Sequence, residues 1–70
     1  KFDDAIVRLK LALKEAPQNA QVHYLLAIAY ANTGKFSDAK SEYQEVLKHC
    51  QDSRLKTLAQ GGLSKIQNKN

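Results

Sequence analysis

The feature of this sequence that most constrains its fold is an internal repeat. Apolar residues return after 34 positions, so that Phe2, Ala5, Leu9 and Ala12 correspond to Phe36, Ala39, Tyr43 and Val46. A period of this length is typical of helix–turn–helix units that stack into a solenoid. One such unit cannot bury its apolar face alone, and a stack of units presents a surface to other molecules. The repeat therefore predicts an all-α, antiparallel helix–turn–helix solenoid that serves as a binding or scaffolding module.

Helical periodicity, capping residues and breakers predict about four helices. We expect the first helix to run from a cap at Asp3 to about Ala16, before Pro17, and the second from a cap at Asn19 to about Thr33, before Gly34. The third is expected to run from a cap at Ser37 to Cys50, and the fourth from Asp52 or Ser53 to Ile66. Residues 67–70 are expected to fray. The link from Gly34 to Phe36 is short enough to make the helices on either side of it antiparallel.

Two of these segments have an unusual composition. The second helix is apolar nearly all round, so we expect the first and third helices to cover it. The last helix contains Gly61 and Gly62, each of which costs about 1 kcal/mol relative to Ala in a helix interior. Either a neighbouring helix approaches the backbone closely there, or the helix kinks or ends near Gly61. On the third helix, Glu42 and Glu45 are expected to face solvent.

Length and composition set further bounds. A chain of 70 residues is one small domain or part of a larger one. A core of this size seldom supplies more than about 3–5 kcal/mol, so contacts with neighbours are expected. The sequence has no Met and no targeting segment. We therefore expect it to be a piece of a longer protein, and the sequence does not indicate where in the cell that protein is located. The single cysteine, Cys50, excludes an intramolecular disulfide and hints at a reducing compartment such as the cytoplasm.

The positive charge is concentrated at one end of the chain. Residues 1–52 carry seven basic and seven acidic residues, whereas residues 53–70 carry Arg54, Lys56, Lys65 and Lys69 with no acid, which accounts for the net charge of +4. These cations could touch nucleic acid or an anionic membrane. Because no aromatic or glycine-rich element accompanies them, a solvated outer face of a closing helix is the preferred interpretation.

No set of residues indicates catalysis, a cofactor or a metal, and we predict that the chain is not an enzyme. The only histidines are His23 and His49. His49 and Cys50 are adjacent, so their side chains diverge by about 100° on a helix and cannot converge with others on zinc. His23 is predicted to be a packed, hydrogen-bonded residue between helices, and Cys50 a small apolar filler of the core.

The residues resemble the tetratricopeptide repeat. Its first-helix signature is matched by His23, Leu26, Ala27 and Tyr30, its turn by Gly34 and Phe36, and its second-helix signature by Ala39, Tyr43 and Val46. The resemblance implies that residues 1–17 are the second helix of a preceding repeat, residues 18–53 one complete repeat, and residues 54–70 a closing helix with a frayed tail. Three departures are His23 where the family favours Trp, Gln51 where it has a closing proline, and Gly62 where it has Tyr.

The resemblance also implies a protein or peptide partner, held on a concave wall built from first helices. That wall would present Gln21, Tyr24, Ile28 and Asn32. Tyr24 and Ile28 replace the Lys and Asn with which one subset of the family grips a C-terminal carboxylate, so apolar and aromatic contacts are expected instead. The alternative is that Tyr24 and Ile28 only pack against the last helix.

The repeat fails most clearly at two positions of the first helix. Val7 and Leu11 stand where Ser41 and Glu45 stand one period later. The first helix also lacks the partner helix that would normally precede it and cover Ala5 and Leu9. We therefore expect this face to be buried by another protomer or by an upstream part of the parent protein. Three roles follow from the sequence: an interaction module that scaffolds an assembly and can self-associate, a structural spacer or oligomerisation segment, or a contact with nucleic acid or membrane through the basic last helix.

Overall fold

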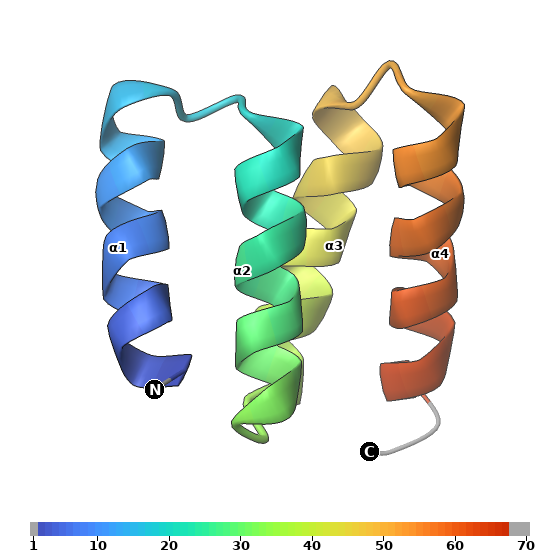
Figure 1. The fold of residues 1–70 in the computed structure, drawn as a ribbon. Coiled ribbons are helices and arrows are strands. Elements are labelled where there is room, and N and C mark those ends of the chain that lie inside the picture. The colour runs from blue at the N-terminus through green and yellow to red at the C-terminus, as the bar shows by residue number, and fades with distance from the viewer. Residues whose placement is uncertain (1, 68–70) are drawn as a thin grey trace.

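The computed structural model describes residues 2–67, which form four antiparallel helices. They are α1 (Phe2–Glu15), α2 (Ala20–Asn32), α3 (Phe36–His49) and α4 (Ser53–Gln67). Helix α2 packs between α1 and α3, and α3 packs in turn against α4, so the helices follow one another in space as they do in the chain (Figure 1). The described residues include no strand, which confirms the predicted all-α helical repeat.

Helix α2 begins and ends where its capping residues predict. The Asn19 side chain accepts hydrogen bonds from the backbone amides of Gln21 and Val22 at 3.1 and 3.3 Å. At the other end Gly34 has φ of 81°, a left-handed conformation that glycine adopts without a steric penalty. This lets the Lys35 amide donate to the Tyr30 carbonyl at 2.9 Å, which closes the helix with a Schellman motif.

Two predicted caps are wrong. Helix α1 already includes Phe2, so Asp3 lies in its first turn, where a carboxylate still suits the positive end of the helix dipole. Helix α3 begins at Phe36 after Lys35, which caps it without a side-chain hydrogen bond, and Ser37 lies inside the helix. The reason is the tight turn at Gly34: the Lys35 carbonyl accepts from the Ala39 amide at 2.9 Å, so the first helical turn closes before Ser37 can cap it.

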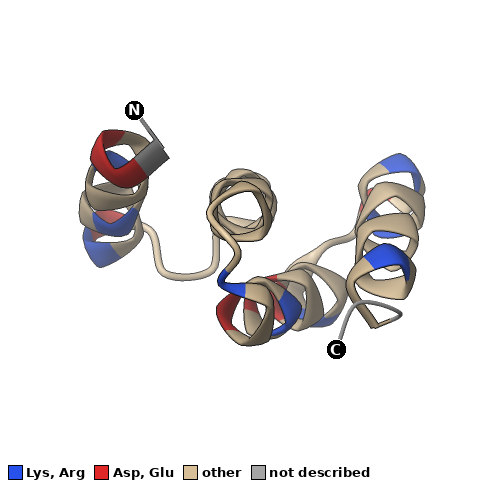
Figure 2. Ribbon diagram, turned by 90° about the horizontal axis from the view of Figure 1, so that it is seen from below, with Lys and Arg blue, Asp and Glu red and all other residues tan. Residues whose placement is uncertain are grey.

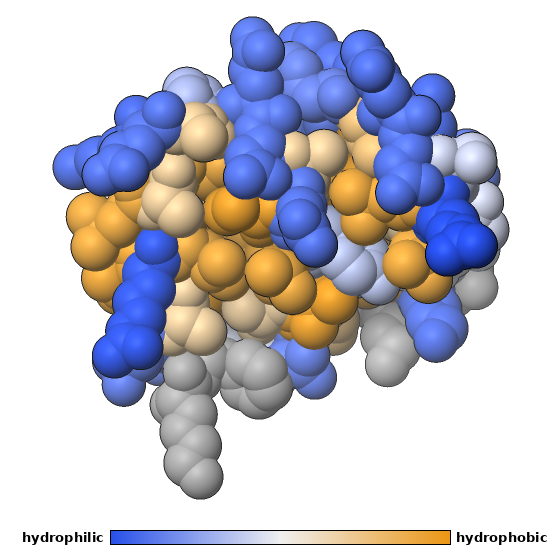
Figure 3. Space-filling view, turned by 45° about the horizontal axis from the view of Figure 1, so that its top comes forward, coloured by the Kyte–Doolittle hydropathy of each residue, from blue (hydrophilic) through white to orange (hydrophobic). Residues whose placement is uncertain are grey.

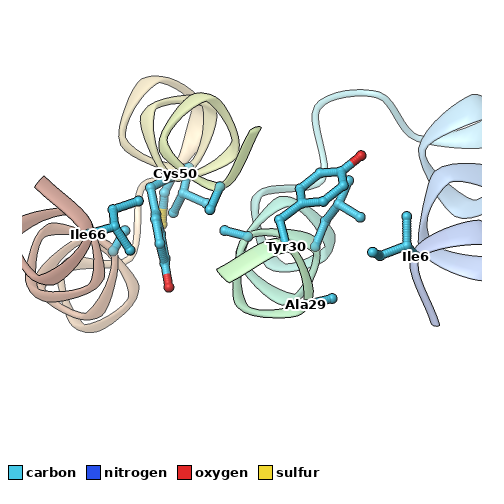
Figure 4. Close-up of a cluster of buried hydrophobic side chains, with 11 residues drawn as sticks. Ile6, Ala29, Tyr30, Cys50 and Ile66 are labelled. Carbon is cyan, nitrogen blue, oxygen red and sulfur yellow. The ribbon is translucent and has the colours of Figure 1, made fainter. Parts of the chain in front are cut away.

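The core lies around α2 and between α3 and α4. Leu26 and Val46 are fully buried, and burying such a side chain stabilises the fold by about 1.5–3 kcal/mol. Ala27 and Ala39 are also fully buried, and their small side chains let α2 and α3 approach closely. Figure 4 shows the cluster of buried side chains extending from Ile6 on α1, past α2, to the contact between α3 and α4.

The two outer helices bury less than the repeat predicts. On α1 the buried residue is Ile6, which is not one of the repeated apolar residues, whereas Ala12, which is one of them, is exposed. On α4, Ala59 and Ile66 are buried, but Leu58 is 53% exposed. Gln67, which we expected to fray, is the last residue of α4, and the rest of the expected frayed tail, 68–70, lies outside the described residues.

The paired glycines do not interrupt α4, which continues through both of them to Gln67. A Cβ atom built on Gly62 would lie 2.4 Å from Cζ of Tyr43, so at this position the ring of α3 approaches the α4 backbone closely. A Cβ atom on Gly61 would have nothing within 4 Å. Close approach therefore explains Gly62, and nothing in the packing explains Gly61.

Candidate protein-interaction site

The structure does not bring the four predicted groove residues of α2 into one groove. Gln21 lines a hollow beside the loop between α3 and α4, Asn32 lines a second hollow at the opposite end of α2 and α4, and Ile28 faces α1. Asn32 also donates a hydrogen bond from Nδ2 to the Ile28 carbonyl at 2.9 Å. The four side chains thus follow one side of α2 but line separate hollows, and a peptide groove along them stays a prediction.

Tyr24, the fourth predicted groove residue, is half-buried and packs on α3. Its ring centroid lies 6.0 Å from that of Tyr43, with the two planes tilted by 58°. This geometry is favourable for two aromatic rings. Tyr43 is itself buried, and the loss of solvent, together with Tyr24, raises the pKa of its hydroxyl above 10.0. The contact of Tyr24 is therefore with α3, whereas the alternative prediction placed it against the last helix.

An apolar groove runs between α1 and α2. We call it the α1–α2 groove and define it by the residues that line it, which are Ala5, Arg8, Leu9, Leu25, Ile28 and Ala29. Leu25 is 47% exposed although it belongs to the central helix of the fold. In Figure 3 hydrophobic surface extends over this side of α1 and α2, with hydrophilic side chains crossing it. A partner helix or apolar segment that covered the groove would remove that surface from water.

Among the residues that line this groove, sequence reasoning named Ile28 as a binding residue and expected Ala5 and Leu9 to lack a covering helix, but it did not identify Leu25 or Ala29. The signal that identified Ala5 and Leu9 is the repeat itself. Ala5 and Leu9 correspond to Ala39 and Tyr43, which are buried in the later unit. Ala5 and Leu9 have the same spacing but are only half-buried, which indicates that a covering helix is missing beside α1.

The comparison with protein families agrees with this architecture. The model of a family described as Tetratricopeptide repeat matches residues 1–61 of the chain. The chain belongs to the tetratricopeptide repeat family. Neither the curated proteins nor the solved structures compared with it gave a significant match. Tetratricopeptide domains generally mediate protein–protein interaction and are generally non-catalytic.

Val7 and Leu11 form a second apolar surface of this tetratricopeptide chain. They are 58% and 55% exposed and lie one helical turn apart on α1. At about 100° per residue, they point away from the side of α1 that carries Ala5 and Leu9. Their exposure agrees with the predicted unpartnered face, and its burial by another molecule stays a prediction.

The cations of α4 do not form a cluster. Arg54, Lys56 and Lys65 are exposed, and Lys69 lies outside the described residues. Lys56 is turned by about 160° from Arg54 around the helix. Lys65 lies on the same side as Arg54 but about 16 Å from it along the helix. Helix α2 carries no charged residue, and α1 and α3 carry both signs (Figure 2). The described residues therefore show no basic patch of the kind that phosphate backbones attract.

His23 joins three parts of the fold, as predicted for a hydrogen-bonded residue between helices. Its Nδ1 lies 2.6 Å from Oε1 of Glu42 on α3, and its Nε2 lies 2.8 Å from the Pro17 carbonyl. A neutral imidazole has one N–H, so only the protonated ring can donate to both acceptors. The prediction that Glu42 faces solvent is wrong, because its side chain is 19% exposed and bound to His23.

The protonation of His23 follows from opposing effects. Burial disfavours the charged ring and lowers its pKa, but the hydrogen bonds to Glu42 and Pro17 and the charges of Glu42 and Glu45 outweigh burial and raise the pKa above 6.5. The His49 ring stacks on His23 with centroids 6.4 Å apart, and its Nε2 lies 3.3 Å from Oε1 of Glu45. Because every member has a structural partner, this cluster holds α2 on α3.

Neither a metal-binding cluster nor a membrane-spanning helix occurs in the described part of the chain. Across residues 2–67, no three His, Cys, Asp or Glu side chains group closely enough to hold a metal ion. None of the helices in this range is both long and apolar enough to span a membrane. Cys50 is buried at the end of the α3 stripe, as expected for a small apolar filler of the core.

Proposed function

We propose that this tetratricopeptide chain is a non-catalytic protein-interaction module that scaffolds a larger assembly, and that the α1–α2 groove is its main interaction surface. The observation that carries the proposal is the exposure of Leu25 beside Ile28 and Leu9 in a groove with apolar walls. A partner that covered these side chains would gain about 25 cal/mol for each Å² of apolar surface removed from water.

The groove is a better candidate than the predicted stripe of α2. Tyr24 is engaged with Tyr43, and Gln21 and Asn32 lie at opposite ends of the helix. A single ligand would have to span both ends to use them. The α1–α2 groove offers contiguous apolar side chains from two helices, which is the arrangement that accepts an amphipathic helix.

A comparison of two leucine variants tests this function. Leu25→Glu places a charge in the groove, whereas Leu58→Glu places one on α4 at a leucine of similar exposure. Proteins captured by the wild-type chain should be retained by Leu58→Glu and lost by Leu25→Glu, with far-UV circular dichroism confirming that both variants fold. Equal capture by all three chains would contradict the proposed surface.

Self-association through Val7 and Leu11 is a second candidate, favoured by their exposure one turn apart. Sedimentation at tens of micromolar checks it, and Leu11→Glu should reduce any dimer. A strict monomer that Leu11→Glu leaves unchanged would refute this candidate.

Two other roles predict different results. A pure spacer role would leave the chain without any captured partner. A role at an anionic surface would give binding to nucleic acid or acidic vesicles, and this binding would weaken steeply with salt.

We retain the predicted division of the chain as part of this proposal. Residues 1–17 would be the second helix of a preceding repeat, residues 18–53 one complete repeat, and residues 54–70 a closing helix. The half-exposed α1 and the close approach of α4 to Tyr43 support it.

A further inference from the structure

The ring of His23 lies at the joint between α1 and the pair formed by α2 and α3. The turn 16–19 connects α1 to α2 (Figure 1), and Nε2 of His23 lies 2.8 Å from the carbonyl oxygen of Pro17 in that turn. On the other side of the ring, Nδ1 lies 2.6 Å from Oε1 of Glu42 on α3. His23 itself is buried on α2. One buried side chain therefore ties the turn to both helices.

The two acceptors compete once the ring loses its proton. A protonated imidazole has two N–H groups, one for each acceptor, whereas the neutral ring has one N–H and one nitrogen with a lone pair. The nitrogen without a proton then faces an oxygen that is also an acceptor. At separations of 2.6 and 2.8 Å two acceptors without a proton between them repel, so one of the two contacts must open.

The contact with Pro17 is the one that we expect to open. Hydrogen bonds to a charged group such as the Glu42 carboxylate are about twice as strong as those between neutral groups. The Glu42 side chain is only 19% exposed, so without a donor its charge would be left largely out of water. The Pro17 carbonyl is neutral and lies in an exposed turn, where water replaces a lost donor. The neutral ring therefore keeps Nδ1–H on Glu42 and turns a lone pair toward Pro17.

The groups around the ring determine the pH at which it loses its proton. On α3 these are the carboxylates of Glu42 and Glu45 and the ring of His49, which stacks on His23 with centroids 6.4 Å apart. Burial lowers the pKa of His23, but the hydrogen bonds to Glu42 and Pro17 and the charges of the two carboxylates raise it above its ordinary value of 6.5. Within residues 2–67, no group of α1 or α4 is among the causes of this shift.

We propose that His23 is a pH-dependent latch between the turn 16–19 and the α2–α3 pair. The protonated ring ties the turn to both helices, and the neutral ring releases the turn while it stays bound to Glu42. The latch goes beyond the proposed function, because it acts at an internal joint of the chain whether or not the α1–α2 groove binds a partner. Since that groove lies between the same two helices, the latch also sets how firmly its walls are held together.

Glu42→Gln is a matched control, because it keeps the size of the side chain and removes its charge. An amide side chain donates as well as accepts hydrogen bonds. In this variant the neutral ring can accept from the new amide at Nδ1 and donate from Nε2 to Pro17, so that both contacts survive the loss of the proton. The turn should then stay held at every pH.

NMR of the nitrogen-15-labelled chain between about pH 5 and pH 9 tests the latch, since histidine titrates in this range. The shifts of the two ring nitrogens of His23 report which of them keeps the proton. The Gln18 amide belongs to the same peptide group as the Pro17 carbonyl, so its shift reports the hydrogen bond to that carbonyl.

Hydrogen exchange of two turn amides measures how far the turn opens. The Asn19 amide donates to the Ala16 carbonyl at 3.1 Å inside the turn between α1 and α2. The Cys50 amide donates to the Val46 carbonyl at 2.8 Å at the end of α3 and is the internal reference. Both exchange rates are corrected for the intrinsic pH dependence of exchange, so that protection is compared and not the raw rate.

In the wild-type chain we expect Nε2 of His23 to lose its proton and the Gln18 shift to follow with the same midpoint, above pH 6.5. Protection of the Asn19 amide should fall about tenfold relative to that of Cys50, as the loss of one hydrogen bond implies. Glu42→Gln should show neither change at the turn, and far-UV circular dichroism checks that this variant folds.

Three results would overturn the latch. They are a neutral wild-type ring that keeps its proton on Nε2, a Gln18 shift that does not follow the titration of His23, and a release of the turn in Glu42→Gln equal to that in the wild-type chain. The first two need no variant, so they decide the matter even when Glu42→Gln does not fold. The proposed function fails separately, when Leu25→Glu captures partners as well as the wild-type chain does.

Discussion

The two adjacent glycines of α4 allow a sharp test of the packing, because the same substitution meets different surroundings one residue apart. At Gly61 an added Cβ atom has nothing within 4 Å, whereas at Gly62 it lies 2.4 Å from Cζ and 2.6 Å from the hydroxyl oxygen of Tyr43. Ordinary carbon–carbon contacts lie at about 3.5–4.0 Å. In Gly62→Ala, the buried Tyr43 ring must therefore move by about 1 Å or more.

The expected magnitudes follow from helix propensity and overpacking. Replacing Gly by Ala in a helix interior stabilises it by about 1 kcal/mol, and this is the whole effect at Gly61. At Gly62 the same gain is opposed by overpacking, which costs about 1–3 kcal/mol. Gly61→Ala should therefore stabilise the chain by about 1 kcal/mol, which raises its Tm by about 4–8 °C. Gly62→Ala should be less stable than Gly61→Ala by about 1–3 kcal/mol.

Urea unfolding followed by far-UV circular dichroism measures both variants. The control is Tyr43→Leu, which removes the ring; in that background Gly62→Ala should stabilise the chain as Gly61→Ala does. Equal stabilisation by Gly61→Ala and Gly62→Ala in the wild-type background would show that α3 and α4 do not approach as described.

Three further predictions concern the His23 contacts and the ends of α2. Because the pKa of His23 is raised above 6.5, its contribution to stability should be full below pH 6.5 and be lost as the pH rises through the raised value. Urea unfolding between about pH 6 and pH 9 should show this decline, and a slope unchanged in His23→Gln would contradict it. Asn19→Ala should lower the free energy of unfolding by about 1 kcal/mol through loss of the cap, and a change near zero would argue against the cap. Gly34→Ala should also destabilise, by about 1 kcal/mol in thermal unfolding, since alanine is strained at φ of 81°; an unchanged or raised Tm would refute the left-handed terminus.

The repeat predicted the fold well because each of its residues has a packing role. The cap at Asn19, the left-handed Gly34 and the buried Leu26 could be predicted from sequence, since each depends on local geometry or on a strong apolar period. The start of α3 could not, because Lys35 offers no capping side chain and the first turn is closed by its backbone.

The site was predicted less well, for a physical reason. The sequence identified α2 as a helix with apolar residues on nearly every side, and such a helix gives no periodic signal to separate core from surface. Whether Leu25 or Leu26 is buried depends on where the neighbouring helices lie. Leu25 is 47% exposed, whereas the adjacent Leu26 is 1% exposed. Val7 and Leu11 were identified because their helix is amphipathic and the later unit provides a reference for each position.

The claim that the α1–α2 groove is the interaction surface is tested most directly by mapping amide chemical shifts of the chain as a captured partner protein is added. The account predicts that the largest changes occur at Ala5, Leu9, Leu25 and Ile28, which line the groove. Changes confined to the α4 side, at Leu55 and Leu58, with the groove unaffected, would contradict it.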